Sequence, residues 1–206
     1  MSKLALGLAG AGGATGLGAT AAYKAGLFSS TEEAISLTVR ETLSKEGYEL
    51  VSTDEKFKAF FTEFKGDGSF ISEVEKHKKE GEDLKNDNGD KGKEALKALC
   101  SSYLDSKDNL DKAIKWCVLR IQDKPLPESK TWKNIETGET DKSTWETAFN
   151  SFKDKMVEYK VEGISQATTA EQGYSILKGW CSNSKKLPIN NQNRTVQTNA
   201  ISWCIN

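Results

Sequence analysis

Apolar side chains recur at helical spacing along most of this chain. The clearest case is a set of four phenylalanines at positions i, i+3, i+4 and i+7, namely Phe57, Phe60, Phe61 and Phe64. This spacing places all four rings on one face of an amphipathic helix. Ser52 or Thr53 can cap its first turn with a side-chain oxygen, and Gly66 follows the last ring. The segment is therefore predicted to be a helix with a buried aromatic face.

Other segments show the same periodicity, and none shows a convincing alternation of apolar and polar positions that would indicate a strand. The further predicted helices cover approximately residues 34–46, 69–84, 96–103, 110–121, 143–163, 169–181 and 195–204. Capping-box patterns precede two of them, at Ser30–Glu33 and at Ser143–Glu146. We therefore predict an all-α fold, with an N-terminal hydrophobic helix followed by a helical ectodomain.

The first 28 residues contain an uncharged stretch of twenty residues from Leu4 to Tyr23, with Lys3 before it and Lys24 after it. As a helix, this stretch would span about 30 Å, the thickness of the hydrocarbon core of a bilayer. We expect it to be either a transmembrane anchor or a cleaved export signal with a loose A-x-A site at residues 19–21. A flexible Gly/Ala tail of a cytosolic protein is the third alternative.

The glycines of this stretch also resemble a dinucleotide-binding loop. Gly10, Gly12 and Gly16 form a G-x-G-x-x-x-G pattern, but such a loop functions between a β-strand and a helix of a βαβ unit. The preceding segment has no β-branched residue, and the rest of the chain lacks the Val/Ile-rich segments of a parallel sheet. Nucleotide binding is therefore disfavoured, and the stretch is assigned to a membrane or to export.

Three short motifs occur twice along the chain, in the same order. The pairs are FKAFFTEFK (57–65) with WETAFNSFK (145–153), LKALC (96–100) with LKGWC (177–181), and AIKWCV (113–118) with AISWCI (200–205). The offsets are 88, 81 and 87 residues, and the differences between them fall in polar loops. We therefore predict two similar multi-helix repeats. The domain boundaries we expect are 1–28 for the N-terminal segment, 29–121 for the region with the first repeat, and 128–206 for the second.

Each predicted repeat contains two cysteines. The midpoint between Cys100 and Cys117 falls at 108–109, in a predicted turn, and that between Cys181 and Cys204 falls at 192–193, in a polar loop. Residues equidistant from the turn of an antiparallel helix hairpin lie level with each other. We therefore predict structural disulfides Cys100–Cys117 and Cys181–Cys204, which require an oxidising compartment. Four buried thiols in the cytosol are the alternative, and zinc is disfavoured because no C-x-x-C spacing occurs.

Charge and candidate chemistry narrow the function classes. The chain has 29 basic and 30 acidic side chains, and since only Lys3 and Lys24 precede residue 29, the remainder has 27 against 30. This balance argues against a nucleic-acid partner. The single histidine, His77, lies in a charged segment, and the carboxylates show no spacing that singles out an acid/base pair. No catalytic, cofactor-binding or metal-ligating residue is assigned.

The chain as a whole resembles large paralogous families of surface or exported proteins of haemotropic mycoplasmas. The resemblance is carried by the start MSKLALGLAGAGGATGLGATAAY, by the lysine-rich helical body, and by the motifs AIKWCV and AISWCI. It implies a wall-less bacterium that lives on red blood cells, and a protein that is exported or held at the membrane. Members are mostly proposed to be antigenically variable surface proteins, and since no activities are assigned to them, no functional residues carry over.

We therefore expect a membrane-anchored or secreted helical surface protein, located at the cell membrane with an extracellular domain or released from the cell. A host protein is the expected partner, besides the membrane itself. Variation and contacts are expected in the polar loops 85–93, 134–142 and 182–194, because loops tolerate change best. Two alternatives remain: a membrane-tethered intracellular helical interaction module, and an enzyme of unknown type.

Overall fold

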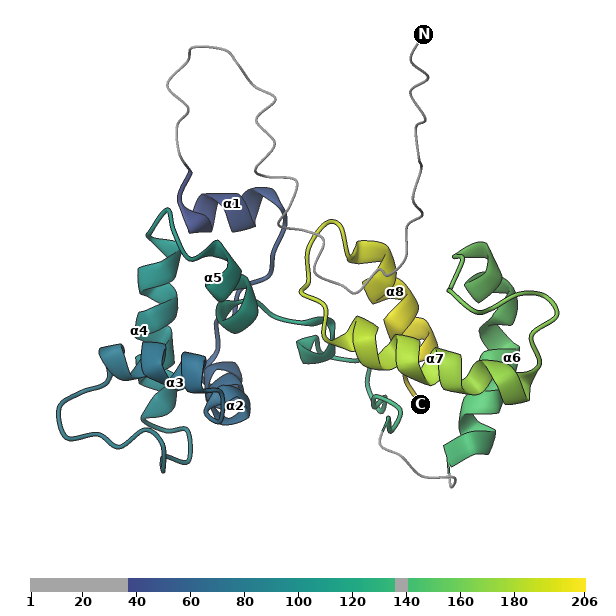
Figure 1. The fold of residues 1–206 in the computed structure, drawn as a ribbon, viewed down its shortest axis with the longest axis horizontal. Coiled ribbons are helices and arrows are strands. Elements are labelled where there is room, and N and C mark those ends of the chain that lie inside the picture. The colour runs from purple at the N-terminus through teal and green to yellow at the C-terminus, as the bar shows by residue number, and fades with distance from the viewer. Residues whose placement is uncertain (1–36, 136–140) are drawn as a thin grey trace, which may run out of the picture. The chain divides into compact units, whose positions relative to one another are not determined.

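The computed structural model describes residues 37–135 and 141–206, which belong to a unit that spans Ser36–Asn206. Within these residues the backbone forms eight α-helices and two short 3-10 helices (Figure 1). Strand-like pairing in this part of the chain is limited to three isolated antiparallel bridges. The all-α class is therefore confirmed for the described residues. The stretch 4–23, predicted to be a hydrophobic helix, lies outside them.

The first helical group comprises the elements from α1 to α5. Its members are α1 (Val39–Lys45), α2 (Asp54–Phe64), α3 (Gly68–Val74), the 3-10 helix η2 (Glu75–His77), α4 (Gly92–Leu104) and α5 (Leu110–Cys117). Helix α4 contacts α1, α2, α3 and α5 (Figure 1). It is therefore the element around which this group packs.

The second helical group comprises the elements from η3 to α8. Its members are the 3-10 helix η3 (Ile121–Asp123), α6 (Lys142–Glu158), α7 (Ala170–Lys185) and α8 (Arg194–Trp203). Helix α7 contacts α6, α8 and η3, so it has the place in this group that α4 has in the first. The chain passes from one group to the other at Leu119, which packs against the hydrophobic cores of both.

Aromatic side chains form much of both cores. In the first group Phe60, Phe61 and Trp116 are buried, and the ring of Phe70 meets that of Trp116 edge-on at a centroid distance of 5.4 Å. In the second group Trp145, Phe149 and Trp203 are buried in the same manner. Each such side chain contributes roughly 1.5–3 kcal/mol when it is removed from water. The predicted aromatic face of α2 is therefore a core face.

Side-chain caps fix where several helices begin. Thr38 forms a capping box with Glu41 at the start of α1, Thr53 caps α2, and Thr169 forms a capping box with Gln172 at the start of α7. Each hydroxyl accepts a hydrogen bond from a backbone N–H that lacks a partner within its helix. The pattern at Ser30–Glu33 lies outside the described residues.

The capping box predicted at Ser143–Glu146 is wrong. Helix α6 begins one residue earlier, at Lys142, and Asp141 is its N-cap residue without a side-chain cap hydrogen bond. The carboxylate of Glu146 instead lies 3.6 Å from Nζ of Lys142, four residues before it on the same helix. The acidic side chain that would complete the box therefore forms an i,i+4 ion pair.

Three helices end earlier than their patterns indicate. One is α6, which is predicted to end near Gly163 and ends at Glu158. The helix predicted over residues 69–84 ends as η2 at His77, because Lys78 takes an extended conformation and the charged run after it has no apolar side chain to bury. The helix predicted over residues 110–121 ends at Cys117, and Val118 is extended. In these last two cases an apolar residue beyond the helix, Leu84 or Ile121, is still fully buried.

The residues after Cys117 are extended where the sequence pattern predicts a further helical turn. Leu119 donates its backbone N–H to Glu49 O at 2.7 Å and accepts from Ile189 N at 2.9 Å. Two residues on, Ile121 N donates to Leu187 O at 2.9 Å. These bonds attach a short extended segment to residues 49–51 on one side and to residues 187–189 on the other. Backbone hydrogen bonds therefore connect the first helical group to the α7–α8 loop.

Candidate functional site

Both helix hairpins close on a pair of cysteines. The Sγ atoms of Cys100 on α4 and Cys117 on α5 are 2.01 Å apart, and those of Cys181 on α7 and Cys204 after α8 are 1.97 Å apart. These are the two pairs predicted from the repeated motifs. All four side chains are buried, so each link lies inside a core and not on the surface.

A glycine meets a phenylalanine ring in each group. A Cβ atom added to Gly92, at the start of α4, would lie 2.3 Å from the ring of Phe61, and one added to Gly173 on α7 would lie 2.1 Å from the ring of Phe149. Real Cβ atoms do not come this close to carbon, so these helices approach α2 and α6 as they do only because both positions lack a side chain.

Arg120 is the most extensively bonded charged residue among those that join the two groups. Its guanidinium donates to both carboxylate oxygens of Glu63 and to Asp123. Its central carbon lies 4.6 Å from the ring centre of Phe60 and 5.6 Å from that of Phe64. Burial opposes the charge, but the bonds to Glu63 and Asp123 outweigh burial and raise the pKa of Arg120. The sequence analysis did not single out this residue.

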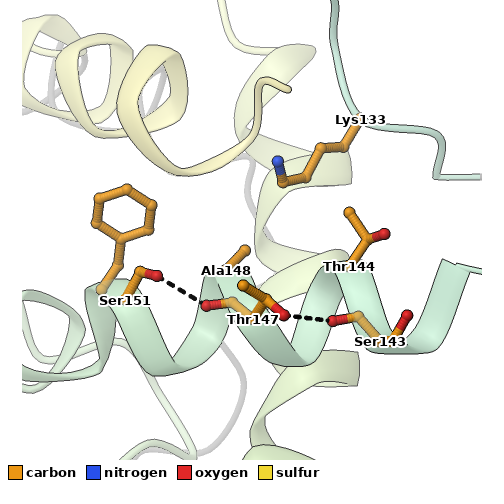
Figure 2. Close-up of a pocket in the computed structure, with 7 residues that line it drawn as sticks. Lys133, Ser143, Thr144, Thr147, Ala148 and Ser151 are labelled. Atoms are coloured by element: carbon orange, nitrogen blue, oxygen red, sulfur yellow. Dashed lines mark hydrogen bonds between the residues drawn. The ribbon is translucent and has the colours of Figure 1, made fainter.

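A groove of about 380 Å³ lies beside α6, on the side where Lys133 approaches the helix (Figure 2). We call it the α6 groove and define it by its lining residues: Lys133, Ser143, Thr144, Thr147, Ala148, Ser151 and Phe152. Thr147 and Ser151 donate their hydroxyl hydrogens to backbone oxygens one turn earlier, those of Ser143 and Thr147. Figure 2 shows the Lys133 side chain reaching over the helix from a separate segment.

Lys133 is the charged group of the α6 groove. Its ammonium donates to Ile205 O and to Asn206 Oδ1, and within the described residues it forms no ion pair with a carboxylate. Burial lowers the pKa of Lys133, and the nearby Lys130 lowers it further. In the part of the chain that the structure describes, the groove therefore presents a half-buried positive charge bonded to neutral oxygens.

A second groove, of about 640 Å³, lies between the segment before α6 and the end of α7. Its lining residues are Gln122, Trp132, Lys133, Asn134, Ile135, Ser182, Lys185 and Lys186. Nζ of Lys185 lies 5.4 Å from the ring centre of Trp132, a cation–π contact. Burial, and then the adjacent Lys186, lower the pKa of Lys185.

Three carboxylates with strongly lowered pKa values, Asp67, Glu73 and Asp54, are structural ion-pair partners. Hydrogen bonds from Lys76 and Lys112 lower the pKa of Glu73 to about 2, and bonds from Lys97 and Lys93 lower that of Asp54 to about 2. These contacts join α3 to α5 and α2 to α4. They hold helices together, and Glu73 and Lys112 also line a groove of about 320 Å³ as an ion pair.

The remaining sequence candidates lie apart from any assembled chemistry. His77 is half-buried at the end of η2, away from the residues that line the two grooves. Within residues 37–135 and 141–206, no group of three or more His, Cys, Asp or Glu side chains is placed to hold a metal ion. The same residues include no helix with the length and apolar character needed to cross a bilayer.

Comparison of the chain with protein family models, with curated proteins and with solved structures finds no match.

Proposed function

We propose that this protein is a disulfide-linked helical body that is displayed at the cell membrane or secreted. The observation that supports this most directly is the pairing of all four cysteines at disulfide distance inside the two cores. Disulfides persist in oxidising compartments and are rare in the cytosol of mesophiles. The uncharged stretch from Leu4 to Tyr23 supplies a membrane anchor or an export signal. Both cases place the helical body outside the cell.

We also propose that the two helical groups are copies of one repeat. Three contacts support this beyond the sequence motifs. The disulfides join equivalent hairpins, and the ring–glycine contacts Phe61–Gly92 and Phe149–Gly173 follow the same 88- and 81-residue offsets. The third contact is made by the lysine that follows the last ring of each phenylalanine motif. Nζ of Lys65 donates to Asp87 O in the first group, and Nζ of Lys153 donates to Gln166 O in the second.

Backbone pairing gives a further argument for the duplication. In the first group Val51 N donates to Cys117 O at 2.9 Å, and in the second Lys133 N donates to Cys204 O at 2.8 Å. Each of these bonds flanks an antiparallel bridge, Leu50–Val118 in the first group and Trp132–Ile205 in the second. A second backbone bond flanks each bridge on its other side. An extended residue pair thus closes each hairpin onto the segment before its phenylalanine helix. Such irregular pairing is not a general property of helical hairpins, so its recurrence favours a common origin.

The proposed role is contact with host components through a surface that varies around a fixed scaffold. Core aromatic side chains and cysteines fix the hairpins, whereas the loop residues 85–91, 134–135 and 186–193 lie between helices and accept substitutions with less cost. Of the loops predicted over 85–93, 134–142 and 182–194, residues 92–93, 142, 182–185 and 194 belong to helices instead. The resemblance to paralogous surface proteins of haemotropic mycoplasmas is consistent with this role. A host protein is the proposed partner.

Protease treatment of intact cells tests the proposed location. Trypsin should release peptides of residues 37–206 from intact cells, and mass spectrometry without reductant should find Cys100 linked to Cys117 and Cys181 linked to Cys204. A membrane-impermeant label on intact cells should give the same topology. Full protection of the body until the cells are lysed, together with four free thiols, would instead favour the membrane-tethered intracellular module.

The mature N-terminus distinguishes the two forms of export. A protein that starts at Met1 or Ser2 retains its N-terminal stretch as an anchor, whereas a start near Ala22 or Tyr23 shows cleavage of a signal. N-terminal sequencing of protein purified from membranes and from culture medium measures this directly. An N-terminus at Met1 in a protein found only in the soluble cell fraction would contradict both.

A further inference from the structure

In the first helical group the outer face of α2 is covered by polypeptide. The guanidinium of Arg120 stacks on the rings of Phe60 and Phe64 and bonds to Glu63 between them. The backbone that carries Arg120 is extended and pairs with Pro188 as an antiparallel bridge. An extended segment with one charged side chain, matched by an opposite charge on the helix, therefore occupies this face.

The corresponding face of α6 is the α6 groove. The offset of 88 residues brings Ala148 to the position of Phe60, Ser151 to that of Glu63 and Phe152 to that of Phe64. The loss of one phenyl ring and one carboxylate opens the space that the first group fills. Ala148 is largely buried in the second core and the ring centre of Phe152 lies 6.4 Å from that of Trp203, but beside them a groove of about 380 Å³ remains open.

The charge of this face is reversed between the two groups. Glu63 gives the α2 face its negative charge, whereas Ser151 leaves the α6 groove without one. Lys133 adds a positive charge where the first group has Val51, since both residues donate their backbone N–H to the second cysteine of their hairpin. Among the described residues this half-buried ammonium has no carboxylate partner, an arrangement that is costly, and an acidic ligand removes that cost.

We propose that the α6 groove binds an extended peptide that presents a Glu or Asp side chain to Lys133. An apolar side chain next to the acidic one packs on Ala148 and Phe152. The extended conformation follows from the segment 119–121, which fills the same face of α2, and the acidic residue follows from the reversed charge. This inference rests on the proposed duplication, which aligns α6 with α2, but it does not depend on the location of the protein in the cell.

Fluorescence anisotropy with labelled peptides tests the proposal on the oxidised full-length chain. The first probe is fluorescein-labelled Gly-Val-Glu-Val-Glu-Val-Gly, and the second has lysine in place of both glutamates. The acidic probe should bind at low salt and the basic probe should not. Binding should weaken as the salt concentration rises, because the attraction between exposed charges is screened.

Two substitutions locate the binding in the groove. Lys133→Gln removes the ammonium and should weaken binding of the acidic probe by about 10-fold or more, an effect of about 1.4 kcal/mol. Ser151→Glu recreates the carboxylate of Glu63 and should abolish binding by repulsion. Ser151 is exposed, so this second variant is expected to fold even if the first does not. Thermal melting followed by circular dichroism checks that both remain folded.

Matched controls carry the same charge changes elsewhere. Lys58→Gln on α2 alters a half-buried residue and Ser175→Glu on α7 an exposed one; neither residue lines the groove, and both variants should bind as the unaltered chain does. Equal binding of the acidic and basic probes, or unchanged binding in folded Lys133→Gln, would overturn the proposal. Binding of an acidic oligosaccharide such as a heparin hexasaccharide at Lys133, without binding of the acidic peptide, would also overturn it.

Discussion

At the scale of single residues, Gly92 and Gly173 determine how closely two helices approach their phenylalanine partners. Phe61 and Phe149 are fully buried, so neither ring can move aside into solvent. A methyl group at either glycine therefore forces the helices apart or drives the ring off its preferred rotamer. The two positions are in this respect the least tolerant of substitution among the helical glycines that the structure describes.

Gly173→Ala is expected to destabilise the protein by about 1–3 kcal/mol, the usual range for overpacking of a core. Urea denaturation followed by circular dichroism measures this difference. Gly179→Ala on the same helix is the matched control, because a Cβ there meets no atom within 4 Å. It should stabilise the protein by roughly 0.5–1 kcal/mol, since alanine is the better helix former. Equal effects of the two substitutions would contradict the packing argument.

The pKa of Glu73 gives a pH dependence of known sign. Hydrogen bonds from Lys76 and Lys112 lower that pKa in the folded protein to about 2. The unfolded chain therefore binds the proton more readily, so stability is fully present above the ordinary glutamate value, near 4.5, and is lost as the pH falls from there to about 2. Asp54 and Asp67 have lowered pKa values for the same reason and add to the loss.

Glu73→Gln should therefore make stability less sensitive to acid. The difference in urea midpoint between pH 5 and pH 2.5 should be smaller in this variant than in the unaltered chain. Glu55→Gln, at an exposed position of α2, is the control and should leave that difference unchanged. If both variants lose as much stability on acidification as the unaltered chain, the contacts of Glu73 do not provide the acid dependence.

At the scale of elements, apolar periodicity predicted helices well where the pattern is dense and poorly where it thins. The four phenylalanines, followed by Gly66, predict a helix that stops before that glycine, and the structure ends it at Phe64. When Leu84 is counted in the apolar pattern, the predicted helix extends across a charged run. Because that run cannot be buried, the helical structure ends with η2, seven residues before Leu84. The pairing of Val118 and Ile205 with upstream segments depends on tertiary contacts, and local periodicity contains no signal for it.

Each disulfide is expected to stabilise its hairpin separately. Replacement of Cys100 and Cys117 together by alanine should cost about 3 kcal/mol, because the unfolded chain regains the freedom of a closed loop of this length. The same change at Cys181 and Cys204 should cost a similar amount. Denaturation in urea without reductant measures both. Dithiothreitol should lower the stability of the unaltered chain but have no further effect on a variant that lacks all four cysteines.

At the scale of the whole molecule, residues 118–121 link the two cores, alongside the backbone bonds that join residues 46–49 to residues 189–191. Leu119 packs against both cores, and Arg120 joins Glu63 on α2 to Asp123 on η3. Because the Arg120 side chain is only 12% exposed, its bonds are less screened by water than those of the surface pairs. The two helical groups are therefore expected to unfold in one cooperative transition.

Arg120→Gln should separate that transition into two. The loss of charged hydrogen bonds that are largely shielded from water is expected to cost about 2–3 kcal/mol, and it removes a contact that spans both groups. Differential scanning calorimetry measures both effects. Arg40→Gln is the control, because the Arg40–Asp105 pair is exposed at 51% and 63% and should contribute less than about 1 kcal/mol. A single unshifted transition in Arg120→Gln would contradict this account.

The cysteine pairs were accessible from the sequence, because the repeated motifs place each cysteine at an equivalent point of a hairpin. The α6 groove was not. It depends on the absence of a ring at Ala148, which is informative only when α6 is aligned with α2, and on Lys133, which the fold brings there from a separate segment. A groove that exists because one helical group has a smaller side chain than the other can be recognised only when the two folded groups are compared.

The buried disulfides also limit how far this chain can be stretched. If force is applied through the two ends of the chain, the residues between linked cysteines cannot extend even after their helices unfold. Sequence separations of 17 and 23 residues correspond to about 60 Å and about 80 Å of fully extended chain. That length stays folded back within each hairpin. Under the pull of a flowing medium, a body tethered to a cell surface would therefore lengthen less than the same chain without disulfides. Its two hairpins would remain closed.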